Sequence, residues 1–235
     1  MAKHRINIRG VLIPNDYKWY YDYFGEDSTC PADVQKVMDA FLDGDEIEVY
    51  INSPGGVIDV GSEIYTLLRG NRENIKIYIT GEACSAASIV AMAGHCEMAP
   101  TALMMVHCVS TRAAGNHSEM EHTAEMLRTA DQALCTAYTE KSGMSEADAL
   151  AMMEHETWLT AEQAKEHGLI DAVMFEENDT DTPFVAGPLF ALPGKDQLDK
   201  VRSMLEEAEP EGENKDSAFL IQAQFNLLKM RGERV

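Results

Sequence analysis

Three short segments of this 235-residue chain carry groups that could act together in acyl transfer. The first, Gly-Glu-Ala-Cys-Ser-Ala-Ala-Ser at 81–88, places Ser85 between the apolar runs 75–80 and 89–94. A serine at such a strand-to-helix turn can expose its hydroxyl for attack on a carbonyl carbon. The N–H of Ala86 would then lie at a helix N-terminus, where negative charge is favoured. Taken alone, the segment is equally typical of a tightly packed turn.

Two other segments supply groups that a reactive serine needs. Residues 51–56 read Ile-Asn-Ser-Pro-Gly-Gly after an apolar strand-like run, and paired glycines let a backbone N–H such as that of Gly56 approach a ligand closely. His107 ends the run Met-Met-Val at 104–106, so it can present an imidazole at the end of a strand as a general base. Singly, the first could be a plain turn and the second a structural histidine.

Apolar periodicity predicts an α/β fold around these segments. The capping box at 160–163 and Gly168 delimit a short helix after residue 156. The strands are expected over 5–13, 47–51, 75–80 and 104–107, and the helices over 31–42, 57–69, 85–94, 117–142, 196–208 and 217–230.

Together the segments resemble the proteolytic subunit of the Clp protease and its serine-peptidase family. That family combines a strand ending in Ile-Asn-Ser-Pro-Gly-Gly, a Gly-x-x-x-Ser turn, a Met-x-His strand end, and an acid before an aromatic-Leu-Ser/Thr-Ala run. The fourth element reads Glu-Thr-Trp-Leu-Thr-Ala from Glu156 onward, and the resemblance covers roughly residues 45–174. Of the spacings, only that between Ser85 and His107 differs, by being a few residues short.

The resemblance implies a Ser-His-Glu triad made of Ser85, His107 and Glu156. The backbone N–H groups of Gly56 and Ala86 would form the oxyanion hole, and neither a metal nor an organic cofactor would be needed.

It also implies a ClpP/crotonase-like spiral of ββα units over residues 1–174. Residues 117–142 would be a protruding handle helix that interlocks opposed homo-oligomeric rings, although a plain amphipathic surface helix has the same pattern. Residues 175–235 read as an acidic, partly flexible helical extension that could dock on a scaffold or on a neighbouring subunit.

Several departures point within the family to the head maturation proteases of tailed bacteriophages. Glu156 replaces an aspartate, Ala86 replaces a methionine, residues 108–112 replace Pro-Leu-Gly-Gly, and Trp and Tyr are frequent at 19–23. The short N-terminus shows no counterpart of the axial loops that engage an ATPase ring. These features favour capsid or scaffolding protein as the substrate, with no ATPase unfoldase, in the host cytoplasm or inside a prohead.

Three alternatives to that function stay open. The first is a cellular Clp-type subunit that acts with an ATPase unfoldase. The second is an enzyme of the same spiral fold with other chemistry, either an enoyl-CoA hydratase or isomerase or a Ser-Lys peptidase. The third is a non-enzymatic assembly subunit. Labelling by a fluorophosphonate would exclude the hydratase or isomerase.

Composition excludes several other classes of protein. The formal net charge is −21 and the acidity is spread along the chain, which argues against nucleic-acid binding. Five cysteines without a Cys-x-x-Cys pair argue against a disulfide framework or a zinc ribbon and fit a reducing cytoplasm. The start shows no signal peptide, and no apolar run approaches 18 residues, so no membrane association is expected.

Rival site residues have more ordinary interpretations. Ser88 lies one helical turn past Ser85, where its hydroxyl would bond the preceding turn. His117 and His122 are five residues apart and would face different sides of a helix, which disfavours a metal site. Cys84 is expected to be a small buried residue, and Asp171 is the next carboxylate to test should Glu156 prove not to be the acid.

Overall fold

A computed structural model describes residues 2–42, 44–176 and 200 of the chain. The chain divides into two units, Met1–Glu176 and Glu177–Val235. All helices and strands given below belong to the first unit. The helices predicted over 196–208 and 217–230 lie outside the described residues, apart from Lys200.

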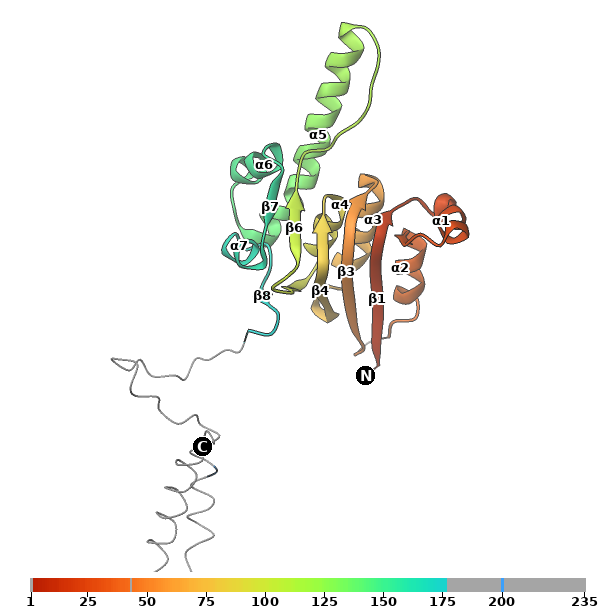
Figure 1. Cartoon of the computed structure of the whole chain (residues 1–235), viewed down its shortest axis with the longest axis vertical. Helices are drawn as coiled ribbons and strands as arrows, with labels where there is room; N and C mark the ends of the chain where they lie inside the picture. The colour runs from red at the N-terminus through yellow and green to blue at the C-terminus, as the bar shows by residue number, and fades with distance from the viewer. Residues whose placement is uncertain (1, 43, 177–199, 201–235) are drawn as a thin grey trace, which may run out of the picture. The chain divides into compact units, whose positions relative to one another are not determined.

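The strands of the described part form one eight-stranded sheet with the order β2-β1-β3-β4-β5-β8, and β6 pairs with β4 and β7 (Figure 1). All neighbouring strands run parallel except β6 and β7. The strands are β1 (Lys3–Leu12), β2 (Ser28–Thr29), β3 (Glu46–Gly56), β4 (Ile75–Cys84), β5 (His95–Met98), β6 (Leu103–Val106), β7 (Thr157–Leu159) and β8 (Ala172–Val173). The predicted α/β class is therefore confirmed, and the structure shows that the sheet is mainly parallel.

One face of the sheet forms the core and is covered by helices. The side chains of Ile8, Ile51 and Ile77 are fully buried on this face, against α2, α3 and α4. The alternation of apolar and polar residues in these strands follows because the opposite face, with Arg5 and Lys76, lies open. The helices are α1 (Lys18–Phe24), α2 (Pro31–Met38), α3 (Ile58–Arg69), α4 (Ala86–Ala91), α5 (His117–Ser142), α6 (Glu146–Glu154) and α7 (Ala161–Glu166).

β3 and β4 extend further than their apolar runs predict. The Ile-Asn-Ser-Pro-Gly-Gly segment does not leave the sheet as a turn, because the register with β1 shifts between Arg9 and Val11 and pairing continues to Gly56. The shift is what allows Pro54 inside a paired strand. β4 pairs first with β5 through 76–79 and then with β6 through 82–84. The carboxyl ends of β4 and β6 therefore meet at one edge of the sheet.

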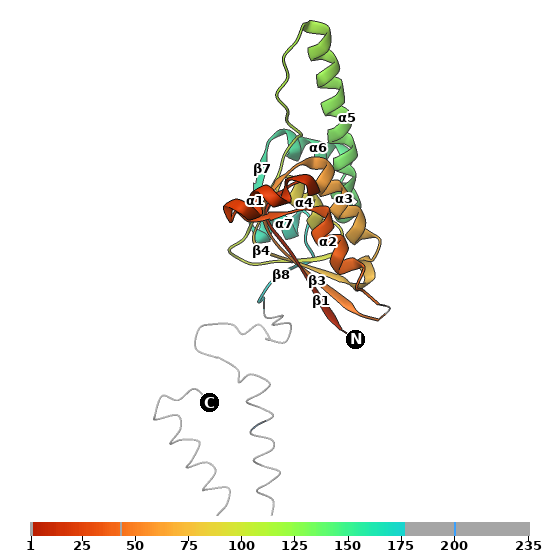
Figure 2. The same cartoon turned by 90° about the vertical axis from the view of Figure 1, so that its right-hand side faces the viewer.

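α5 is the longest described helix and projects beyond the sheet, with the irregular segment 107–116 running alongside it (Figures 1 and 2). Its bounds are those predicted. Asn116 and Glu119 form a capping box at its N-terminus, and Gly143 ends it at a φ of 76°. The fully buried residues of α5 are Cys135, Ala137 and Tyr138, all in its last three turns. Only this end of α5 packs into the domain.

Two predicted helices are shorter in the structure than in the sequence-based assignment. α2 ends at Met38 and α4 at Ala91, where the predictions reach residues 42 and 94. After α2 the side chain of Phe41 still packs partly against the core, but Leu42 is 71% exposed. After α4 the apolar pattern continues because the turn that leads to the next strand packs on the core. Met92 and Ala93, for example, are buried although they follow α4.

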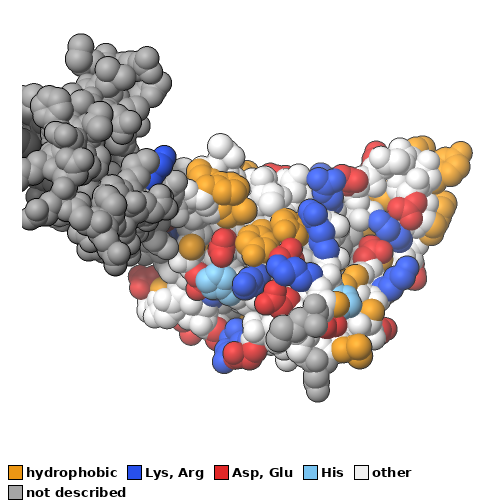
Figure 3. All heavy atoms as spheres, turned by 90° about the horizontal axis from the view of Figure 1, so that it is seen from below, with side chains coloured by type: hydrophobic (Ala, Val, Ile, Leu, Met, Phe, Trp, Pro, Cys, Tyr) orange, Lys and Arg blue, Asp and Glu red, His pale blue; other side chains and the backbone are white. Residues whose placement is uncertain are grey.

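The described surface mixes charges of both signs. Figure 3 shows acidic and basic side chains intermingled over one face. Ion pairs such as Lys3 with Glu46 and Glu48, and Arg69 with Glu140, account for part of this pattern. Among the described residues, no helix is long and apolar enough to cross a membrane.

Candidate active site

The turn between β4 and α4, residues 84–88, is called here the serine turn. Ser85 leaves β4 at φ 54° and ψ −126°, a conformation that L-residues with side chains rarely adopt. Its N–H donates to the carbonyl of Met105 at 2.9 Å, which fastens the serine turn to β6. Strain of this kind costs about 1–3 kcal/mol and is typical of serines exposed at a strand-to-helix elbow.

Gly55 accounts for part of the fit between β3 and the serine turn. A Cβ on Gly55 would lie 2.5 Å from the carbonyl oxygen of Cys84, 2.8 Å from Ser85 Cβ and 3.0 Å from the Ala86 nitrogen, and its φ is +92°. Only glycine fits there. Gly56, the predicted oxyanion donor, is the next residue and is exposed. Its N–H belongs to the peptide bond that joins it to Gly55.

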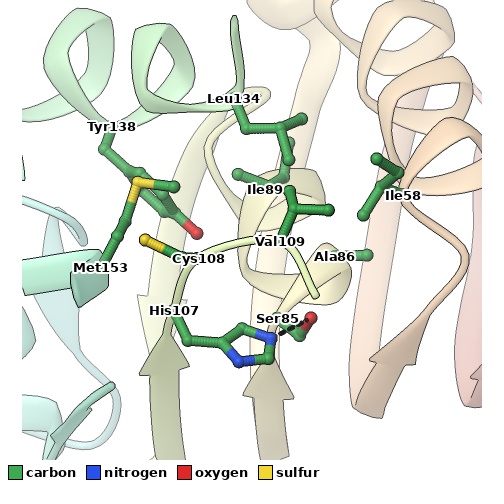
Figure 4. A pocket seen from close by; sticks show the side chains of 10 residues that line it. All are labelled: Ile58, Ser85, Ala86, Ile89, His107, Cys108, Val109, Leu134, Tyr138 and Met153. Atoms are coloured by element: carbon green, nitrogen blue, oxygen red, sulfur yellow. Dashed lines mark hydrogen bonds between the residues drawn. The ribbon is translucent and has the colours of Figure 1, made fainter. Parts of the chain in front are cut away.

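His107 follows β6 directly and lies beside Ser85. Its Nε2 is 2.7 Å from Ser85 Oγ, the distance of a hydrogen bond between a serine and a general base (Figure 4). The neighbouring N–H groups hold the chain that follows: Cys108 donates to the carbonyl of Met153, and Val109 to the carboxylate of Asp131 at 2.7 Å. Ser85 and His107 are 22 positions apart in the sequence but adjacent in space, because β4 and β6 end at the same edge of the sheet.

Glu156 lies on the other side of His107, in residues 153–157, called here the acid turn. Its Oε2 is 4.0 Å from His107 Nδ1, beyond hydrogen-bond length, and its side chain is 61% exposed whereas that of His107 is 28% exposed. Glu156 also has a positive φ, 45°. Its other oxygen accepts a long hydrogen bond, 3.4 Å, from the exposed Trp158 ring. The structure thus brings the three predicted triad residues together, with the acid at a longer distance than the serine.

A small apolar cavity opens next to Ser85 and His107. Its volume is about 20 Å³, comparable to the space that one water needs. The side chains around it come from α3, α4, α5 and α6 and from the segment after His107 (Figure 4). The apolar members are Ile58, Ala86, Ile89, Val109, Leu134 and Met153.

Ser88, the rival serine, is fully buried and already bonded. Its Oγ lies 2.6 Å from the carbonyl oxygen of Ser85 and 2.7 Å from Tyr138 Oη. The expectation that Ser88 bonds the preceding turn is confirmed, whereas Tyr138 was missed by sequence reasoning. Its signal in the sequence was its position four residues after Leu134, on the same face of α5.

The remaining candidate residues either lie away from the Ser85 hydroxyl, as Asp171 does, or are unreactive, as Cys84 is. The carboxylate of Asp171 accepts from the Cys96 N–H and pairs with Lys141 and His95, none of which lines the cavity. Burial raises the pKa of the Cys84 thiol to about 12, so it stays protonated near neutral pH. No group of three or more metal-ligating side chains occurs in the described parts of the chain.

The α/β fold and the contact between Ser85 and His107 are those expected of a serine peptidase, and the family comparison gives the same class. Residues 36–177 match the Clp protease family. The chain belongs to that family and is a ClpP-like serine peptidase.

Named relatives are similar over the same region. Two ATP-dependent Clp protease proteolytic subunits from strains of Bacteroides fragilis are each 32% identical over 143 residues, and one from Bacteroides thetaiotaomicron is 30% identical over 143 residues. These alignments cover 60% of this chain. They cover 69% of the first relative and 65% of the other two, so the chain spans about two thirds of their length.

Proposed function

We propose that the protein is an endopeptidase in which Ser85 attacks the peptide carbonyl and His107 accepts its proton. The 2.7 Å contact between His107 Nε2 and Ser85 Oγ is the observation that carries this proposal. As the C–N bond breaks, His107 returns the proton to the leaving amine, and water then hydrolyses the acyl ester by the reverse steps. Glu156 orients the imidazole and stabilises its cation.

The backbone around Ser85 supports an oxyanion hole made of the N–H groups of Ala86 and Gly56. Ala86 is the first residue of α4, and the first N–H groups of a helix have no partner within the helix. Gly55 lets β3 approach the Ala86 nitrogen closely, since a Cβ on Gly55 would lie 3.0 Å from it. The N–H of Gly56, the next residue, therefore lies near the N–H of Ala86. Removal of one such donor typically costs about 3 kcal/mol of transition-state stabilisation.

The small cavity beside Ser85 supports a preference for a small apolar residue on the acyl side of the cleaved bond. Its walls carry Ile89, Leu134 and Met153 and no charged side chain. An apolar pocket discriminates by about 1–3 kcal/mol per methylene that it accepts or rejects. Peptides with Ala at this position should therefore be cleaved faster than those with Lys or Glu.

Active-site labelling tests the proposed chemistry. Wild-type protein and Ser85→Ala are treated with a fluorophosphonate probe and assayed on a fluorogenic peptide, with the exposed Ser118→Ala as a matched control. We expect labelling and cleavage in the wild type and in Ser118→Ala, and neither in Ser85→Ala. Labelling that persists in Ser85→Ala, or that is lost only when Ser88 is changed, would refute the assignment of Ser85.

For the biological setting, the names of the relatives favour a Clp-type proteolytic subunit that works with an ATPase unfoldase in the bacterial cytoplasm. All three are called ATP-dependent Clp protease proteolytic subunits. They support this setting better than the head maturation role to which the departures in the sequence point.

Head maturation of a phage capsid or scaffold remains the second candidate because of one specific observation. Residues 108–112 replace the family's Pro-Leu-Gly-Gly, and in the structure they run as an irregular segment beside α5. Cleavage of a folded reporter only with ATP and a Clp ATPase would support the first setting. Cleavage of a flexible capsid or scaffold segment at the same rate without ATP would support the second.

A homo-oligomeric ring is proposed for either setting. The protruding part of α5 carries the partly exposed Met120 and Leu127, and α1 presents exposed aromatic side chains including Trp19 and Tyr23. Exposed apolar surface of this extent is typical of protein–protein contacts. The ring would enclose the Ser85 sites and restrict access to flexible polypeptide.

A further inference from the structure

A buried chain of hydroxyl groups connects α5 to the serine turn. Tyr138 Oη is 2.7 Å from Ser88 Oγ, and Ser88 Oγ is 2.6 Å from the carbonyl oxygen of Ser85. The carbonyl can only accept, so Ser88 gives it its one proton and must accept from Tyr138. The direction of the chain is therefore fixed: Tyr138 donates to Ser88, and Ser88 donates to Ser85.

These hydroxyls lie inside the protein, where each needs its partner. Ser88 is fully buried and Tyr138 is 3% exposed. Burial holds the pKa of the Tyr138 phenol well above its usual range, so the phenol keeps the proton that it donates. A buried hydroxyl that loses its partner typically costs about 1–3 kcal/mol. Neither hydroxyl takes part in the proton transfers of the proposed reaction.

The carbonyl that receives this chain shares a peptide group with the Ala86 N–H. Because the peptide bond is planar and trans, the carbonyl oxygen of Ser85 and the N–H of Ala86 point in opposite directions from one rigid plane. A hydrogen bond to the oxygen therefore fixes the direction of the N–H. It also polarises the peptide, because hydrogen bonds in a chain strengthen one another.

The backbone angles of Ser85 do not by themselves favour the observed orientation of the peptide plane between Ser85 and Ala86. Ser85 sits at φ 54° and ψ −126°, where surrounding contacts must hold the strain. The plane is set by the ψ of Ser85, and the Ser88 hydroxyl and the Ser88 N–H both bond its carbonyl oxygen, at 2.6 and 2.9 Å.

We propose that Tyr138 and Ser88 are positioning residues that aim and polarise the Ala86 N–H toward the oxyanion. The proposal rests on the proposed function, since it assigns a role in stabilising the acyl-transfer transition state. It also links that N–H to α5, because Tyr138 belongs to the buried end of the helix whose other end projects from the domain. Displacement of α5 would thus weaken the oxyanion hole.

A double-mutant cycle tests the order of the chain. We expect Ser88→Ala to lower kcat about 10-fold with KM within about 2-fold, less than the ~10²–10³-fold loss of a whole oxyanion donor, because the N–H itself remains. Tyr138→Phe should lower kcat about 3-fold. The double variant should match Ser88→Ala within about 2-fold, because Tyr138 acts through Ser88. Additive effects of the two substitutions would overturn the proposal.

A transition-state analogue separates positioning from a merely structural role. A peptide boronic acid, which forms a tetrahedral adduct with the serine, should bind Ser88→Ala about 10-fold more weakly, whereas a non-covalent peptide product should bind equally well. The matched control is Ser142→Ala, which removes another hydroxyl of α5, bonded to the Tyr138 carbonyl at 2.7 Å. It should lower the Tm and leave kcat and boronate affinity unchanged.

The outcomes also distinguish the two proposals. If Ser85→Ala still hydrolyses peptides, the proposed function itself fails. If hydrolysis depends on Ser85 but Ser88→Ala and Tyr138→Phe behave like Ser142→Ala, losing stability without losing kcat, the positioning role fails and the peptidase assignment stands.

Discussion

The two turns that flank His107 each contain a non-glycine residue at positive φ, but their surroundings differ. Ser85 in the serine turn and Glu156 in the acid turn are both non-glycine residues at positive φ, 54° and 45°. The serine turn is held by a strand-to-strand hydrogen bond, by the contact with Gly55 and by the Ser88 hydroxyl. In the acid turn, residues 154–156 are exposed, and the Glu156 N–H donates to the Met153 carbonyl at 3.2 Å.

This difference indicates which parts of the site are held firmly within one chain and which are not. Ser85 and His107 are preorganised within one chain, because several buried contacts hold the serine turn in place. The carboxylate is 4.0 Å from the imidazole and 61% exposed, so in the proposed ring a neighbouring subunit would be needed to order it. A carboxylate strengthens its interactions when water is removed from it, so assembly would act on the acid turn first.

The largest effect is expected from a substitution that breaks the serine turn. Gly55→Ala would place a Cβ 2.5 Å from the Cys84 carbonyl oxygen at a φ of +92°, which should slow acylation by a fluorophosphonate about 10³-fold in the protein that still folds. Gly70→Ala is the matched control, because its nearest contact is 3.8 Å and its φ is −60°. Wild-type labelling rates in Gly55→Ala would contradict the tight fit.

A smaller loss is expected on the acid side. Glu156→Gln should lower kcat about 10²-fold with KM little changed, because it removes the charge that stabilises the imidazolium. The loss should be less than the ~10⁴-fold typical of a buried triad acid, since Glu156 is exposed. Turnover near the wild-type value would remove Glu156 from the triad and leave the acid unassigned.

The link between assembly and the acid turn can be tested on α5. Leu127→Glu places a charge on the projecting part of the helix, and we expect it to dissociate the ring and to lower kcat about 10-fold. Sedimentation velocity and peptide hydrolysis at the same protein concentration would measure both effects. The prediction fails if the wild type sediments as a monomer at micromolar concentration and is fully active.

The smallest effect on activity is expected from Asp171→Asn. Burial works to raise the pKa of this carboxyl, but hydrogen bonds from the Cys96 N–H and Lys141 lower it below its ordinary value. The contribution of Asp171 to stability is therefore present above the unfolded pKa of about 3.9 and is lost as the pH falls through the folded pKa.

We accordingly expect kcat within about 2-fold of wild type for Asp171→Asn. Its Tm should lie below that of the wild type at pH 6, and the gap should close below about pH 4. A loss of turnover comparable to that of Glu156→Gln would instead point to Asp171 as an acid of the site.

Much of the fold could be predicted from the sequence because its strands and helices are long and periodic. The strands β1, β3 and β4 and the helices α3 and α5 follow runs of apolar residues at spacings of two or of three to four. β7 and β8 have three and two residues, too short to show a period. α1 was missed because its aromatic side chains are exposed and do not form a one-sided apolar stripe.

The residues of the candidate site also divide into those that the sequence could predict and those that it could not. Ser85 and His107 could be placed near each other because parallel neighbouring strands end at one edge of a sheet. The Ser88–Tyr138 bond could not, because it depends on how α5 crosses α4, which no local pattern encodes. Whether Glu156 completes the triad stays a prediction, since its distance from His107 is set by an exposed turn.

The buried Cys84 has a practical consequence for chemical probing of this protein. With its pKa raised to about 12 by burial, the thiolate fraction at pH 7 is about 10⁻⁵. Soft electrophiles such as iodoacetamide, which select thiolates, should therefore leave residue 84 unmodified. An acylating or phosphonylating warhead would therefore meet the adjacent Ser85 without competition from the Cys84 sulfur.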